Sequence, residues 1–285
     1  MSTDQTYLEI KIAIPIDYQE MFIAELMDLD FDGFEQYDDY LLAYVPAARY
    51  NDVSREYLQQ LISSQPVSCH LEGEKVYEPQ NWNEQWEKTI QPMQVGKFYI
   101  RPTWTPVETP DGLLLLEIDP KMAFGTGYHE TTRLMLRMLP NCVEQSVHVL
   151  DVGTGTGVLA IAALKLGAHH VFGFDIDEWS YVNATENAHL NGVIDHFEVK
   201  EGSFEVIPAG KTYDLVLANV NRNMLLSTSR QITDQVKNGG TLVLSGLLDV
   251  DEDAIMNNED YAALEHIERM QENEWICLRF IKRDA

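Results

Sequence analysis

The stretch Val147-His-Val-Leu-Asp-Val-Gly-Thr-Gly-Thr-Gly157 decides the fold of this chain. An apolar strand ends in Asp151, and glycines then occupy every second position from 153 to 157. An apolar segment of helical character begins at Val158. Glycine lets a backbone approach a ligand closely, and the N-terminus of the following helix offers unpaired N–H groups. The pattern therefore predicts a ligand-binding turn between a strand and a helix.

The spacing of these glycines excludes two common nucleotide sites. A dinucleotide site reads G-x-G-x-x-G and a phosphate loop ends in G-K-[ST], and residues 153–157 match neither. A second apolar strand, residues 169–174, ends at Asp175, 22 residues after Gly153. A carboxylate at that strand end accepts hydrogen bonds from both hydroxyls of a ribose, so Asp175 is the predicted ribose ligand. Asp177 is predicted to cap the next helix.

The order of Asp151 and the three glycines resembles motif I of the class I S-adenosylmethionine-dependent methyltransferases. This resemblance implies an α/β fold, a Rossmann-like domain whose mostly parallel sheet has a reversed last strand. It also implies binding of S-adenosyl-L-methionine, with Gly153, Gly155 and Gly157 at the cofactor. The periodicity downstream predicts helices over 224–236 and 251–270, with strands over 215–218, 241–245 and 275–281.

The segment Asp119-Pro-Lys-Met-Ala-Phe-Gly-Thr-Gly-Tyr-His-Glu-Thr-Thr132 narrows the resemblance to one family. It is similar to the signature Ala-Phe-Gly-Thr-Gly-Thr-His-Pro-Thr-Thr of the PrmA family, whose members methylate protein eleven of the large ribosomal subunit. A Trp-x-x-x-Trp stretch at 82–86, the segment from Val95 to Trp104 and the acidic N-terminal region match the same family. Two positions depart from the signature: Tyr128 replaces Thr and Glu130 replaces Pro.

The family's cofactor contacts, carried over to this sequence, fall on Thr132, Gly153, Asp175 and Asn219. Asn219 ends the apolar strand at 213–218, at the carboxyl edge of the sheet, where doubly wound folds bind ligands. An Asn carbonyl can hold an amine by its N–H and aim the nitrogen lone pair at the methyl donor. Phe124 is expected to pack over the reacting methyl group, so Asn219 and Phe124 are the predicted catalytic residues.

Two positions keep an alternative role. Asn219 is closely followed by Asn221 and Asn223, and asparagine commonly forms turns. His129 is expected to be a hydrogen-bonded anchor of the signature loop, with a proton carrier as the alternative. Direct in-line (SN2) transfer of a methyl group to an uncharged amine needs no nucleophilic residue and no metal, so neither is predicted, and no general base is assigned.

Residues 1–73 are predicted to form a separate small ferredoxin-like α+β domain, which the family resemblance makes a substrate-recognition domain. The pattern gives strand, helix, a hairpin with a two-residue turn, a second helix and a last strand, in the order βαββαβ. The segments are a strand from residue 7, a helix across 17–29, the hairpin turn at 38–39, a helix over 51–63 and a strand over 67–71.

Residues 74–94 are predicted to be a helical linker, because Trp82, Trp86 and Ile90 fall four residues apart and share one helix face. The methyltransferase domain is then expected over residues 95–285. The three cysteines are far apart and never spaced as C-x-x-C, which indicates neither a disulfide framework nor a zinc site.

The net charge of −26 favours a basic protein partner over nucleic acid, whose phosphates would be repelled. Residues 1–73 hold 14 Asp or Glu against 3 Lys or Arg. RNA-binding modules of this fold place aromatics beside basic residues, whereas Phe34, Tyr37, Tyr40 and Tyr44 lie among acids. A protein-docking surface is therefore favoured over an RNA surface, although core packing explains the aromatics more simply.

The chain has no apolar run of membrane-spanning length and no secretory signal pattern, so a cytoplasmic protein is expected. The leading hypothesis is methylation of lysine side chains, the N-terminal α-amine, or both, on the basic ribosomal protein eleven. The alternatives are a lysine methyltransferase acting on another protein and a cofactor-binding module without turnover. A nicotinamide-dependent oxidoreductase would need the missing G-x-G-x-x-G.

Overall fold

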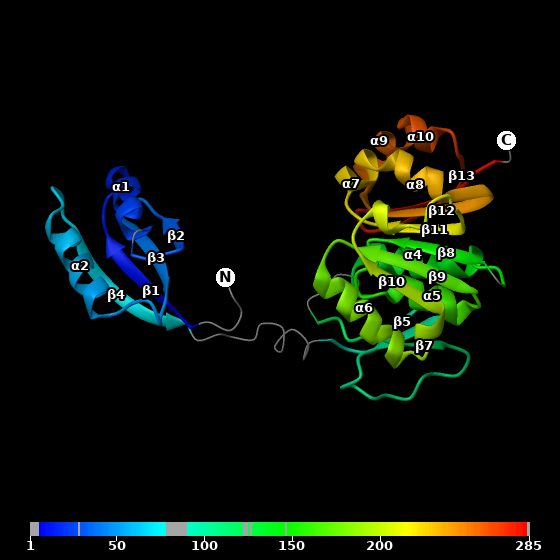
Figure 1. The fold of residues 1–285 in the computed structure, drawn as a ribbon, viewed down its shortest axis with the longest axis horizontal. Helices are drawn as coiled ribbons and strands as arrows, with labels where there is room; N and C mark the ends of the chain where they lie inside the picture. The colour runs from blue at the N-terminus through cyan, green and yellow to red at the C-terminus, as the bar shows by residue number, and fades with distance from the viewer. Residues whose placement is uncertain are drawn as a thin grey trace. The chain divides into compact units, whose positions relative to one another are not determined.

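The computed structural model of the chain describes residues 6–27, 29–77, 90–121, 125, 127–145 and 147–283. The chain folds as two compact units, Met1–Gln85 and Trp86–Ala285. Each unit has its own main sheet, as Figure 1 shows. Each also has its own buried hydrophobic residues. No helix within the described ranges is long and apolar enough to cross a membrane.

The first unit is a four-stranded antiparallel sheet with strand order β2-β3-β1-β4, the ferredoxin-like arrangement that the sequence predicts. Alternate residues of β1 and β3, such as Ile10 and Ala43, face Phe22 of α1 and Leu58 of α2 in one core. Both helices therefore cover the same face of the sheet. The elements are β1 Tyr7–Ala13, α1 Ile16–Met27, β2 Gly33–Gln36, β3 Tyr40–Pro46, α2 Asp52–Ser63 and β4 His70–Tyr77.

The last strand of this unit differs from the expected range. β4 pairs with β1 over residues 70–77 instead of lying at 67–71, so the predicted linker begins inside the sheet. The strand is exposed over residues 70–76 and only Leu71 and Val76 there are large apolar residues, so the sequence shows no apolar strand pattern at this edge. Trp82 and Trp86 of the predicted linker helix lie outside the described residues, whereas Ile90 is buried.

The second unit is built on a seven-stranded sheet with order β10-β9-β8-β11-β12-β14-β13. The strands β10, β9, β8, β11 and β12 are parallel, and β14 runs antiparallel to both of its neighbours. The prediction of a Rossmann-like sheet with a reversed last strand is therefore confirmed. The strands are β8 His148–Val152, β9 His170–Asp175, β10 Phe197–Glu201, β11 Tyr213–Asn219, β12 Val236–Leu248, β13 Glu265–Glu272 and β14 Trp275–Ile281.

Helices cover both faces of this sheet (Figure 1). One core packs α4, α5 and α6 against the sheet, and a second packs α7 to α10 against the opposite face. The helices are α4 Glu130–Met138, α5 Val158–Leu166, α6 Glu178–Leu190, α7 Arg222–Ser227, α8 Ser229–Gln235, α9 Glu252–Met256 and α10 Glu259–Ala262. Single 3-10 turns lie at Leu139–Asn141, Ile194–His196, Phe204–Val206 and Asp249–Asp251.

Two predicted helices are wrong in extent. The helix expected over 224–236 is divided at Thr228 into α7 and α8. The helix expected over 251–270 is replaced by the short α9 and α10 followed by the strand β13. β13 lies at the sheet edge, where half-buried and exposed side chains alternate and almost all are polar, so no apolar face marks it as a strand.

A three-stranded sheet precedes the signature segment, with β5 Met93–Val95, β6 Phe98–Arg101 and β7 Leu114–Glu117. Three asparagines of α6 and its C-cap hold the end of β7. Asn191 bonds both the N–H and the carbonyl of Glu117, at 3.0 and 2.7 Å. Asn187 accepts from the N–H of Asp119 at 3.0 Å, and Asn183 donates to its carbonyl at 2.8 Å. These bonds fix where the signature segment begins relative to the large sheet.

Candidate active site

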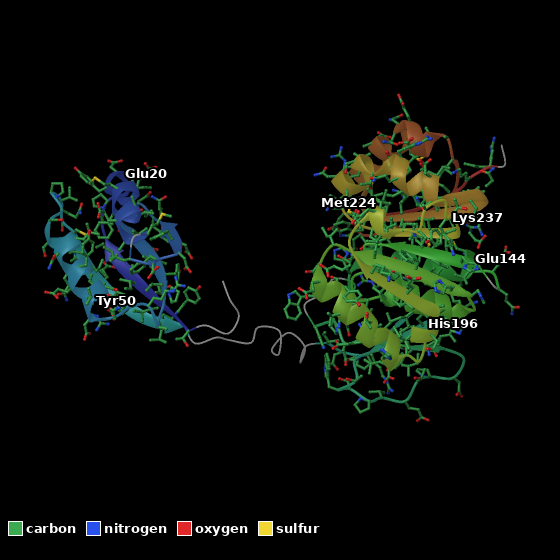
Figure 2. All side chains as sticks on the ribbon, viewed as in Figure 1. Glu20, Tyr50, Glu144, His196, Met224 and Lys237 are labelled. Atoms are coloured by element: carbon green, nitrogen blue, oxygen red, sulfur yellow. The ribbon has the colours of Figure 1, made fainter. Side chains whose placement is uncertain are left out.

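A cavity of about 380 Å³ lies at the carboxyl ends of the parallel strands in the second unit. The strand order reverses between β8 and β11 at this edge, which is where open α/β sheets bind ligands. Met224 of α7, labelled in Figure 2, is one of its walls. The full lining is His129, Thr131, Gly153, Gly155, Phe174, Asp175, Ile176, Asn219, Val220, Asn221, Met224, Gly246 and Trp275.

The turn after β8 forms the floor of one half of this cavity. Gly153 and Gly155 both line it, with φ angles of 67° and 55° that favour glycine. A Cβ on residue 153 would lie 2.6 Å from Cγ1 of Val220, so the turn can approach β11 only without a side chain. The backbone at this turn is therefore open toward the cavity.

Gly157, unlike Gly153 and Gly155, does not line the cavity. It is the N-cap residue of α5 and has a φ of 79°. A Cβ at this position would lie 3.1 Å from the ring of Phe197 and 3.2 Å from Cβ of Ala184. In the structure, Gly157 allows α5, α6 and β10 to pack closely.

Asp175 lies at the end of β9 and lines the cavity. Its Oδ2 accepts from the N–H of Gly155 at 2.9 Å, and its Oδ1 accepts from the N–H of Asp177 at 3.1 Å. The two backbone donors fix the carboxylate while each oxygen keeps further accepting capacity. The Asp177 side chain accepts from the N–H of Ser180 at 2.9 Å, so its predicted role as the N-cap of α6 is confirmed.

Asn219, at the end of β11, faces the cavity from the opposite side of the switch between β8 and β11. Its Nδ2 donates to Oγ1 of Thr132 at 3.3 Å, and Thr132 is fully buried on α4. The Oδ1 of Asn219 is buried and has no hydrogen-bond partner in the described part of the chain. A buried carbonyl oxygen without a partner is costly, and on a residue that lines a cavity it is a candidate acceptor for a ligand.

The three neighbouring asparagines have different places in the structure. Asn221 caps α7 by accepting from the N–H of Met224 at 3.0 Å, and Asn223 is exposed on the same helix. The turn-forming role left open for Asn219 therefore belongs to Asn221. Thr132 lies beside Asn219 in a small neighbouring cavity that also includes Gly125 and Gly153, and it does not line the large one.

The aromatic wall of the cavity was not predicted from the sequence. His129 caps α4 by accepting from the N–H of Thr131 with its Nδ1, at 3.3 Å, which agrees with the expected anchoring role. Its ring meets that of Trp275 edge to face, with centroids 4.7 Å apart. Trp275 opens β14, and its place at the cavity depends on that strand being reversed.

The two departures from the family signature both have partners. The Tyr128 hydroxyl donates to the carbonyl of Gln91. Glu130 pairs with Arg133 at 3.2 Å and accepts from Asn273 at 3.1 Å, so its carboxylate is already engaged. Phe124, the second predicted catalytic residue, lies outside the described residues.

Asp151, immediately before the glycine turn, is a fully buried carboxyl group. Burial is the largest effect on its pKa and raises it to about 7, while a 2.6 Å hydrogen bond from Thr154 acts in the opposite direction. The folded protein therefore binds more protons at this site than the unfolded chain between about pH 4 and 7. The contribution of Asp151 to stability therefore falls as the pH rises through this window.

We expect Asp151→Asn to remove much of this fall, because asparagine is neutral and its carbonyl can still accept from Thr154. From pH 5 to pH 8, the wild type should lose on the order of 3 kcal/mol of unfolding free energy more than the variant. Urea unfolding of both proteins at the two pH values measures the difference. Equal losses in the two proteins would show that Asp151 does not titrate in this window.

The chemistry of this site fits a charged nucleoside ligand such as S-adenosylmethionine. A fixed carboxylate suits a ribose diol, the glycine turn exposes backbone, and the unpaired Asn219 oxygen offers an acceptor for an N–H group. Among the described lining residues, Asp175 is the only carboxylate. The cavity therefore has one polar, charged half and one half that is uncharged and partly aromatic.

Known proteins similar to this chain share one family name. The family model described as "Ribosomal protein L11 methyltransferase (PrmA)" matches residues 16–283. A ribosomal protein L11 methyltransferase of Porphyromonas gingivalis is 38% identical over 265 residues, covering 92% of this chain and 90% of that protein. One from Nitratiruptor sp. is 34% identical and covers 96% of each chain.

A solved structure is also similar. The ribosomal protein L11 methylase of Lactobacillus delbrueckii subsp. bulgaricus matches with a TM-score of 0.63 and 28% sequence identity. The match covers 68% of this chain and 100% of that one. The family model and the two relatives each extend over parts of both compact units.

Proposed function

The chain belongs to the ribosomal protein L11 methyltransferase (PrmA) family, and we propose that it methylates amines of ribosomal protein L11 with S-adenosyl-L-methionine as methyl donor. The acceptors are lysine side chains, the N-terminal α-amine, or both. The observation that carries this proposal is that Asn219, whose carbonyl oxygen is buried without a partner among the described residues, lines the same cavity as the fixed Asp175 carboxylate.

The half of the cavity that carries Asp175 is assigned to the cofactor. S-adenosylmethionine, when bound, supplies a methyl group on a positively charged sulfur. Asp175 accepts from the ribose hydroxyls, and the backbone of Gly153 and Gly155 approaches the remainder of the molecule. Thr132 acts through Asn219, because its hydroxyl holds the Asn219 amide and lies outside the large cavity.

The half of the cavity beyond Asn219 is assigned to the acceptor amine. Asn219 Oδ1 accepts one N–H of the amine and so directs the nitrogen lone pair toward the methyl group. The amine must react uncharged, which costs a lysine with a pKa of about 10.4 roughly 4.6 kcal/mol at pH 7. A carboxylate beside the amine would increase this cost, and Glu130 is held in its pair with Arg133 instead. Phe124 stays a prediction as the residue over the reacting methyl group.

The first compact unit, which includes the predicted recognition domain over residues 1–73, is proposed to bind the ribosomal protein. Residues 1–73 carry 14 acidic residues against 3 basic ones, which supports a basic partner and disfavours direct binding of nucleic acid. Residues 95–285 would then carry the transfer reaction. Since the relatives are named for a ribosomal protein substrate, we infer that the reaction occurs in the cytoplasm.

Thr132→Val should lower kcat for methyl transfer about tenfold, because the Asn219 amide loses the hydroxyl that orients it. Affinity for S-adenosylhomocysteine should change less than threefold. Steady-state kinetics and calorimetry measure the two effects. Thr132→Ser restores the hydroxyl and should recover most of the rate, whereas a Ser variant as slow as Val would exclude this positioning role.

The proposed substrate is tested by incubating the full chain with methyl-labelled S-adenosylmethionine and total ribosomal proteins from cells that lack a related enzyme. We expect the label on L11. Label on a different protein would assign another substrate to the same chemistry. Binding of S-adenosylmethionine with no label on any protein would indicate a cofactor-binding module without turnover.

A further inference from the structure

The uncharged half of the cavity contains one large aromatic surface. Trp275, at the start of β14, lines the cavity together with His129, Val220, Met224 and Gly246. No charged side chain belongs to this half among the described lining residues. Asn219 ends β11 and Trp275 begins β14, with β12 between these two strands, so both lie on the β11 side of the point where the strand order reverses.

His129 and Trp275 form an aromatic pair. The Nδ1 of His129 accepts from the backbone N–H of Thr131 at 3.3 Å, which helps to fix the orientation of the ring. The two rings meet with an interplanar angle of 73°, and an edge-to-face contact covers less of a ring than stacking does. A neutral aromatic surface attracts a cation by its π-electrons without stabilising it as strongly as a carboxylate would.

The position of Trp275 is fixed by ion pairs just before it in the chain. Glu272, at the end of β13, pairs with Arg133 and Arg137 of α4. These bonds tie the turn between β13 and β14 to the helix that His129 caps. Both rings of the pair are thus held by the same helix and hairpin.

The proposed reaction places a growing cation in this half of the cavity. As the acceptor nitrogen forms its N–C bond, the C–S bond of the donor breaks, and the positive charge passes from sulfur to nitrogen. A secondary or tertiary product can lose a proton to water before a further transfer. A trimethylated nitrogen keeps its charge and has no N–H, so Asn219 can no longer hold it.

We propose that Trp275, with His129 against it, is the surface that contacts the alkyl chain and the methylated ammonium of the acceptor residue. This assignment rests on the proposed function and identifies Trp275 as the side chain of the acceptor half that contacts the substrate residue. It makes Trp275 a substrate-binding residue and leaves the cofactor to the half that carries Asp175.

The test uses the complex of the full chain with S-adenosylhomocysteine and the probe Nα-acetyl-Nε-trimethyllysine methylamide. Trp275→Leu should weaken binding of the probe, followed by NMR titration, by about tenfold. Trp275→Phe should keep most of the affinity, because the ring is retained. Calorimetry should give an affinity for S-adenosylhomocysteine within about twofold of the wild type in both variants.

Trp104→Leu is the matched control, since Trp104 is 42% exposed and lies in the loop after β6. It should bind the probe like the wild type. The assignment is overturned if Trp275→Leu keeps full probe affinity, or if it loses affinity for S-adenosylhomocysteine to the same degree. A wild type that binds the probe through Trp275 but transfers nothing to L11 would refute the proposed substrate and leave this assignment standing.

Discussion

Asn219→Ala should lower kcat for methylation of ribosomal protein L11 by about 10²- to 10³-fold. The variant removes the only side-chain carbonyl of the described lining residues that is buried without a hydrogen-bond partner. Loss of one preorganised group at a reacting centre commonly costs roughly 3 to 4 kcal/mol of the barrier. Single-turnover kinetics with saturating S-adenosylmethionine measure this loss without the contribution of product release.

The matched control is Asn223→Ala, because Asn223 is exposed on α7 and does not line the cavity. Its rate should equal that of the wild type within about twofold. Asn219→Ala should keep its affinity for S-adenosylhomocysteine within about threefold, since the cofactor half is intact. A rate for Asn219→Ala within about threefold of the wild type would remove Asn219 from the catalytic machinery.

Asp175→Ala should weaken binding of S-adenosylmethionine and S-adenosylhomocysteine by about a hundredfold. The carboxylate is expected to accept two ribose hydroxyls, and charged hydrogen bonds contribute roughly 1.5 to 3 kcal/mol each. The substitution also deprives the N–H of Gly155 of its acceptor, which loosens the glycine turn. Calorimetric titration with S-adenosylhomocysteine gives the affinity directly.

The neighbouring Asp177 provides the control for this prediction. Asp177→Ala removes the cap of α6 and should cost about 1 kcal/mol of stability, with little effect on affinity for the cofactor. Asp175→Asn should fall between the alanine variant and the wild type, because the amide keeps one accepting oxygen. If Asp175→Ala bound S-adenosylhomocysteine as tightly as Asp177→Ala, the ribose would have to be held elsewhere.

The residues at the ends of parallel strands could be predicted from sequence because those ends meet at one edge of a sheet. Gly153, Asp175 and Asn219 follow three different strands, and the structure brings all three to the same cavity. Trp275 could not be found in this way, since it precedes its strand. Only the reversed direction of β14 carries the beginning of that strand to the carboxyl edge of its neighbours.

Where residues of the same type lie close together in the sequence, only the structure shows which of them lines the cavity. Gly153 and Gly157 have the same left-handed backbone, but only one faces the cavity while the other relieves packing between helices. Asn219 and Asn221 are two residues apart, and only their hydrogen bonds distinguish their roles. Thr132 holds the amide of Asn219, whereas Asn221 caps α7. The extent of the edge strand β4 and the presence of the edge strand β13 could not be recognised, because a mostly polar strand shows no apolar face in the sequence.

The decisive measurement is the intact mass of purified ribosomal protein L11 after incubation with this protein and S-adenosylmethionine, beside the same reaction with Asn219→Ala. We expect mass increments of about 14 Da per methyl group with the wild type and almost none with the variant over the same time. Fragmentation of the product should locate the added groups on amines. An unchanged mass of L11, with binding of the cofactor confirmed in the same sample, would contradict the proposed function.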